Sequence, residues 1–186
     1  MFIPTLLLPL LATLALSFAS PISPRASKGE GSYFRSSSTP NTCLTVQNGY
    51  AAIGSTVALT NCVAIPGTYL DEFQLFSPTG AQKRGPIKLV AHPELCLEAD
   101  ISNGNGGKVT VQSCDASREG QAFSIGSVEG SKMKITIGEN GSQCLDVVKD
   151  SAPIDAKPYG SIKDLQTWEC HGADHPDVAQ QYFSLA

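Results

Sequence analysis

The single tryptophan of the chain, Trp168, lies two positions before a cysteine in the segment QTWEC, among amide and carboxylate side chains. An aromatic ring buries the apolar face of a ligand, whereas amides and carboxylates form hydrogen bonds with hydroxyl groups at its edge. This combination suits a ligand with both kinds of surface, such as a sugar ring. The alternative is that Trp168 belongs to the hydrophobic core.

The sequence gives less support to a metal site or to a catalytic site. Four potential metal ligands follow Cys170 in the segment HGADHPD, but no helix is expected there to bring two histidines to one face, so we predict no metal and no cofactor. The chain lacks a Gly-x-Ser-x-Gly motif, and its Gly-rich SNGNGGK segment is expected in a hairpin. We therefore predict no catalytic residues. The four potential ligands are His171, Asp174, His175 and Asp177.

The N-terminus has the pattern of a secretory signal peptide. Residues 1–24 carry no charged side chain, and an apolar run over residues 2–16 precedes a small-residue cleavage site. A membrane anchor is the alternative, but Pro4 and Pro9 interrupt the run. We expect cleavage after residue 19, a flexible leader over residues 20–32, and a secreted, extracellular protein that does not insert into membranes.

Charge and cysteine content restrict the partners and the environment. The formal net charge of -4 makes nucleic acid a poor partner. Six cysteines are an even number for an exported chain, which favours disulfides over free thiols.

From residue 33 onward the pattern predicts an all-β chain. Short apolar segments such as IKLVA, KVTVQ and MKITI alternate with turn signals such as Asn48-Gly49 and Asn140-Gly141. No window has a sustained helical period.

An internal repeat organises the chain. The segments CLTV, CLEA and CLDV begin at residues 43, 96 and 144, each is followed by a second cysteine, and each repeat ends in Gln-x-Phe. Six cysteines allow 15 pairings, of which sequential pairing within each repeat is the simplest. We place the repeats at about residues 33–83, 84–130 and 131–186 of one domain over residues 33–186. The expected disulfides are Cys43–Cys62, Cys96–Cys114 and Cys144–Cys170.

This threefold pattern resembles the ricin B-type lectin family, which implies a β-trefoil. The family normally has Gln-x-Trp where this chain has Gln-x-Phe three times, a change that bears on packing more than on sugar binding. The resemblance implies a non-catalytic carbohydrate-binding protein with glycans or glycoproteins as partners, and galactose or N-acetylgalactosamine as the ligand type.

The resemblance places the sugar site in the third repeat. The implied carbohydrate-binding residues are Asp146, Gln166, Trp168, Gln180 and Gln181. Gln180 stands where the family usually has Asn, and Gln181 also has a structural alternative, since a buried amide can satisfy backbone groups at a strand end.

The other two repeats lack this set. The first offers no carboxylate and no ring platform, and the second offers a glutamate but no ring. Threonine and glutamine replace Trp168 in them, which favours an exposed or half-exposed position over a core position for the tryptophan. The corresponding residues are Thr45, Ala58, Thr60 and Phe73 in the first repeat, and Glu98, Thr110, Gln112 and Gly120 in the second.

Four further hypotheses remain open. The third repeat has an insertion over residues 149–164, which is either a variable surface loop or a rim of the site through Tyr159. Such a loop also allows a β-trefoil protease inhibitor, and two degenerate repeats allow a trefoil with decayed sites that acts as a structural or effector protein. Asn140-Gly141-Ser142 is an N-glycosylation acceptor. The sequence indicates no oligomeric state.

Overall fold

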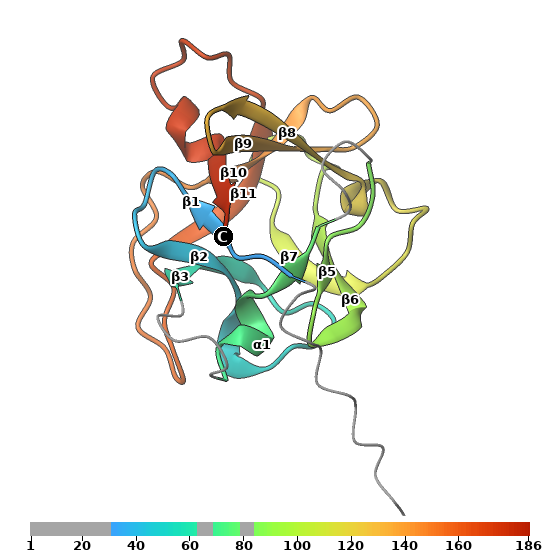
Figure 1. Cartoon of the computed structure of the whole chain (residues 1–186). Coiled ribbons are helices and arrows are strands. Elements are labelled where there is room, and N and C mark those ends of the chain that lie inside the picture. Colours follow the sequence, from blue (N-terminus) through green and yellow to red (C-terminus); the bar gives the residue numbers. More distant parts are fainter. Residues whose placement is uncertain (1–30, 63–68, 79–83) are drawn as a thin grey trace, which may run out of the picture.

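The computed structural model describes residues 31–62, 69–78 and 84–186, and Figure 1 shows the chain. The expected signal peptide and residues 20–30 of the expected leader lie outside the described residues. Within the described ranges, no helix is long and apolar enough to cross a membrane.

Each repeat contributes four short strands, as the alternation of apolar segments and turns predicts. A short helix ends at the glutamine of each Gln-x-Phe segment. The first repeat contains β1 (Phe34–Ser36), β2 (Thr42–Val46), η1 (Gln47–Gly49), β3 (Val57–Asn61), α1 (Asp71–Gln74) and β4 (Phe76–Ser77). The second contains β5 (Lys88–Leu89), β6 (His92–Ala99), β7 (Val109–Ser113), η2 (Glu119–Gln121) and β8 (Phe123–Glu129). The third contains β9 (Lys132–Ile137), β10 (Gln143–Val147), β11 (Lys163–Glu169), η3 (Val178–Gln181) and β12 (Tyr182–Leu185).

The strands form two antiparallel sheets. The larger has the order β10-β11-β3-β2-β1-β12-β9-β8 with an extra β10–β9 pairing, and the smaller has the order β4-β5-β6-β7. Isolated bridges from Ser32 to Phe76 and from Gly85 to Phe123 connect the two sheets. All three repeats therefore share one closed body, in which the central hairpin of each repeat (β2–β3, β6–β7, β10–β11) contacts the next one.

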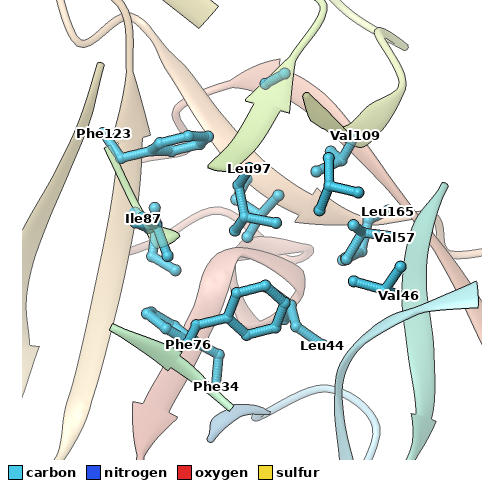
Figure 2. Close-up of a cluster of buried hydrophobic side chains, with 14 of the residues drawn as sticks. Phe34, Leu44, Val46, Val57, Phe76, Ile87, Leu97, Val109, Phe123 and Leu165 are labelled. Atoms are coloured by element: carbon cyan, nitrogen blue, oxygen red, sulfur yellow. The ribbon is translucent and has the colours of Figure 1, made fainter. Parts of the chain in front are cut away.

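The core is built from equivalent residues of the three repeats (Figure 2). The Gln-x-Phe phenylalanines are at most 1% exposed, and the leucines that follow the first cysteines are fully buried. The three hairpins add Val57, Val109 and Leu165 at matching positions. Phenylalanine thus fills the position of the family's tryptophan in every repeat. The other core residues in this set are Phe76, Phe123, Phe183, Leu44, Leu97 and Leu145.

The disulfides pair the cysteines within each repeat, which confirms the expected pattern. They join Cys43 to Cys62, Cys96 to Cys114, and Cys144 to Cys170, over separations of 19, 18 and 26 residues. Each one ties the first strand of a central hairpin to the end of its second strand. Loops of this length contribute about 3 kcal/mol each in the chain-entropy model.

Candidate ligand-binding site

The hairpin β10–β11 brings the predicted site residues together. Asp146 lies directly opposite Gln166, and Cys144 lies opposite Trp168. Because side chains alternate along a strand, these residues share the face that points away from the core, while Leu145 on β10 is fully buried on the other face. A spacing of 20 residues in the sequence thus becomes a cross-strand pair.

A cavity of about 490 Å³ opens on this face. Four of the five predicted residues line it, namely Asp146, Gln166, Trp168 and Gln180. The fifth, Gln181, is fully buried and is not part of the lining. The remaining lining residues are Val148, Lys149, Asp150, Glu169, His171, His175 and Asp177.

Gln181 has well-defined backbone partners. Its Oε1 accepts a 2.8 Å hydrogen bond from the His171 backbone N–H, and its Nε2 donates a 2.9 Å bond to the Glu169 carbonyl oxygen. The equivalent Gln121 makes the same kind of contacts with Asp115 and Ser113. In the second and third repeats, the glutamine of the Gln-x-Phe segment therefore secures the turn that follows the second cysteine.

Asp146 is the most buried polar group of the cavity, at 1% exposure. Its Oδ1 accepts a 2.9 Å hydrogen bond from Gln166 Nε2. Its Oδ2 has no hydrogen-bond partner among the described residues, although the Gln181 amide lies near enough to lower the pKa of the carboxyl. Burial dominates and raises the pKa of Asp146 above its usual value of 3.8.

Trp168 is half-buried and lines the cavity, so the core alternative is not what the structure shows. Its neighbour Thr167 points inward instead and is fully buried. The Thr167 hydroxyl donates to the Gly104 carbonyl oxygen at 2.7 Å and accepts from the Gly107 N–H at 3.0 Å. These bonds fix β11 against the β6–β7 loop and thereby hold Trp168 on the outer face.

A stacked pair of histidines forms another wall. The ring centroids of His171 and His175 are 3.6 Å apart, and both residues line the cavity. Nearby, Lys149 Nζ lies 2.8 Å from Asp177 Oδ1. The stacking of the histidines and the Lys149–Asp177 ion pair were not predicted from the sequence, because they depend on how the loop after Cys170 folds back over β10. In the described part of the chain, no group of three or more potential ligands is arranged to hold a metal ion.

Comparison with known proteins identifies the family. A model of the ricin-type beta-trefoil lectin domain matches residues 32–155. The chain belongs to this family. The match ends before β11, so the ricin-type assignment rests on two and a half repeats and does not include Gln166 or Trp168. A search of curated proteins finds no match.

Solved structures agree with a ricin-type fold. The designed threefold-symmetric protein ThreeFoil is 14% identical with a TM-score of 0.63, over 84% of this chain and 98% of that one. The C-half of an earthworm R-type lectin in complex with GalNAc is 18% identical with a TM-score of 0.56, over 84% and 97%. Cytolethal distending toxin from Haemophilus ducreyi is 16% identical with a TM-score of 0.58, over 84% and 83%. At these identities the likeness shows the fold alone.

The first ricin-type repeat is covered by the insertion of the third. Tyr159 packs against Phe73 with ring centroids 6.0 Å apart, and its hydroxyl donates to the Val46 carbonyl oxygen. Thr60 Oγ1 donates to the Gly160 carbonyl oxygen. Burial raises the pKa of Tyr159 to about 12. The insertion thus occupies the position where the first repeat would hold a ligand.

Tyr159 is therefore not a rim residue of the third-repeat cavity, as one of the two hypotheses held. It does not line that cavity, because the insertion turns away from β10–β11 and toward the first repeat. The fit is close: a Cβ added at Gly49 would lie 2.5 Å from Pro158 Cγ. Since Gly49 also has φ +63°, glycine is the residue that suits this contact.

In the second ricin-type repeat, the carboxylate of Glu98 is already paired with Arg118. Arg118 Nη1 lies 2.8 Å and 2.9 Å from the two carboxylate oxygens of Glu98, and Gln121 Nε2 donates a 2.8 Å bond to Oε2. Gln112 stands at the position of Trp168, so no ring faces this pair. The three repeats thus differ. The first is covered by the insertion. The second has a cavity in which Glu98 is paired with Arg118, and the third has a cavity lined by Asp146 and Trp168.

Asn140 of the glycosylation acceptor is exposed and lies in the turn between β9 and β10. Gly141 follows it with φ +57°. The Asn140 side chain lies on the surface, which is where a glycan would have to be attached.

Proposed function

We propose that this protein is a secreted, non-catalytic lectin that binds a galactose-type or N-acetylgalactosamine-type sugar in its third repeat. The observation that carries the proposal is the arrangement of Asp146, Gln166 and Trp168 around one cavity. In this proposal the Asp146 and Gln166 side chains hold vicinal hydroxyl groups, and the indole of Trp168 lies under the apolar face of the ring. Gln180 contributes a further polar contact.

Gln181 has a supporting role in this proposal. It fixes the backbone on either side of Cys170 through His171 and Glu169, and so positions two lining residues. The earthworm lectin structure in complex with GalNAc supports the choice of sugar class by analogy of fold. The three disulfides suit an extracellular protein, since such bonds persist in oxidising compartments.

The protease-inhibitor hypothesis requires a protruding loop. Residues 158–162 of the insertion are instead bound to the first repeat, where the Ile162 N–H donates to the Leu59 carbonyl oxygen at 2.6 Å. This packing favours the lectin over the inhibitor.

A glycan array tests the proposal. The wild-type protein should bind glycans with terminal galactose or N-acetylgalactosamine, and Asp146→Ala and Trp168→Ala should lose that binding. Gln112→Ala, at the position equivalent to Trp168 in the second repeat, is the matched control and should bind like the wild type. If the wild type binds no glycan, the proposal is wrong and the decayed-trefoil hypothesis gains.

A further inference from the structure

The cavity of the third repeat is acidic. Four carboxylates line it, together with one lysine and the two histidines His171 and His175. Lys149 is paired with Asp177 at 2.8 Å, so these two charges largely cancel. The other three carboxylates, those of Asp146, Asp150 and Glu169, form no ion pair within the described residues, although Lys149 also interacts electrostatically with Asp150, and His171 with Asp146.

One of these carboxylates needs a donor. Asp146 lines the cavity and is only 1% exposed, and its buried Oδ2 has no hydrogen-bond partner in the described ranges. A buried acceptor without a donor is costly, and a charged donor satisfies a carboxylate better than a neutral one. Burial also raises the pKa of Asp146, because it disfavours an ionised carboxyl, and the nearby Gln166, Gln181 and His171 only partly oppose this rise.

The remaining two carboxylates extend the negative charge around the opening. Asp150 and Glu169 are both exposed and come from opposite ends of the hairpin, beyond β10 and at the end of β11. Charges at the rim of a cavity attract an oppositely charged ligand and repel a like-charged one, with an effect that salt screens. Neutral sugars gain nothing from this field.

Resting on the proposed function, we infer that the preferred ligand is a hexosamine with a free, protonated amino group, rather than its N-acetylated or neutral counterpart. An ammonium group offers three donors and a positive charge, and so matches both the unpartnered Asp146 oxygen and the acidic rim. N-acetylation removes the charge, and an acidic sugar such as N-acetylneuraminic acid brings a repelled carboxylate.

Titration calorimetry with the full secreted chain tests the inference. The ligands are galactosamine, galactose, N-acetylgalactosamine and N-acetylneuraminic acid, with the matching glucose series in parallel, at about pH 6 where a sugar amine is protonated. We expect the free amino sugar to bind about 3- to 10-fold more tightly than its neutral counterpart at low salt, and this preference to shrink at about 1 M salt. N-acetylneuraminic acid should bind most weakly.

Variants separate the rim charge from the site itself. Asp150→Asn and Glu169→Gln should each reduce the ratio of amino-sugar to neutral-sugar affinity by about 2- to 3-fold. The matched control is Asp155→Asn, which removes an exposed carboxylate outside the cavity and should leave the ratio unchanged.

The outcomes distinguish the two proposals. Equal affinity for galactosamine and galactose, or tighter binding of N-acetylgalactosamine, overturns the inference and leaves the lectin function standing. An equal loss of the ratio in Asp155→Asn also overturns it, because the effect would then follow net charge rather than the rim. Absence of binding to every sugar overturns the proposed function and the inference together.

Discussion

Gln166 and Asp146 lie directly opposite each other on β11 and β10, and Gln166 Nε2 donates a 2.9 Å hydrogen bond to Asp146 Oδ1. The amide orients the carboxylate and leaves its second oxygen without a hydrogen bond from any residue described in the structure. Burial raises the pKa of Asp146, and the Gln166 bond partly opposes that rise. A buried carboxylate with one oxygen free of hydrogen bonds can accept a bond from a ligand, but it lowers the stability of the protein when no ligand is bound.

We expect Asp146→Asn to stabilise the protein near neutral pH. Burial gives the Asp146 carboxyl a higher pKa in the folded than in the unfolded protein. The free energy of unfolding of the wild type therefore falls as the pH rises from about 3.8 through the folded pKa. Asparagine does not ionise and still accepts the Gln166 bond. Its Tm should therefore exceed that of the wild type by a few degrees at about pH 7 and approach it at about pH 3. Thermal unfolding at the two pH values measures the difference, and a variant Tm below that of the wild type at pH 7 contradicts the account.

The single tryptophan makes the site observable by fluorescence. Because Trp168 is half-buried in the cavity wall, a sugar stacked on it should shift its emission to shorter wavelength. Saturation should give a Kd on the order of millimolar for a monosaccharide. Asp146→Ala keeps the tryptophan and should show no shift at the same sugar concentration. An identical shift in that variant would indicate binding elsewhere or a solvent effect.

We expect Tyr159 to contribute to stability rather than to sugar binding. Tyr159→Ala removes a partly buried ring that packs against Phe73, and should cost about 2 to 3 kcal/mol, at or below the low end for a fully buried aromatic residue. Tyr159→Phe keeps the ring, loses the bond to the Val46 carbonyl oxygen, and should cost about 1 kcal/mol. Denaturant unfolding measures both losses. Sugar affinity should remain that of the wild type, and a tenfold loss of affinity in folded Tyr159→Phe would restore the rim hypothesis.

The second repeat should be convertible into a weak site. Gln112→Trp supplies the missing ring, but Arg118 still occupies the Glu98 carboxylate, so this single variant should bind one sugar per chain like the wild type. Adding Arg118→Ala frees the carboxylate, and the double variant should bind two. Because the Arg118–Glu98 pair is partly exposed, its loss should have little effect on stability. Calorimetric stoichiometry checks the count.

The number of sugar sites per chain determines whether the protein can agglutinate cells. A monomer with one site cannot cross-link cells, so the wild type should bind sugar without agglutinating erythrocytes. The double variant Gln112→Trp with Arg118→Ala should gain weak agglutination. Size-exclusion chromatography with light scattering must establish the monomer first, and agglutination by a verified wild-type monomer would count against a single site.

Much of the fold was predictable because it repeats. The CL segments and Gln-x-Phe segments mark residues that the fold buries three times, as Leu44, Leu97 and Leu145 show at 0% exposure. The cysteine pairing followed from the same repetition. The convergence of Asp146 and Gln166 followed from the family resemblance, which supplied a cross-strand register that spacing alone does not give.

The residue pattern of this protein by itself determined which faces of its strands are buried, since apolar alternation and threefold repetition are local and survive without any knowledge of the fold. Only the tertiary structure decided whether the surface equivalent to the third-repeat cavity is covered, paired with a charged side chain or open in each repeat. Tyr159 reaches Val46 across 113 residues, Arg118 reaches Glu98 across 20, and His171 stacks on His175 in a loop without periodicity. Such contacts depend on where loops return in space, and loops carry no hydrophobic period from which that return can be read.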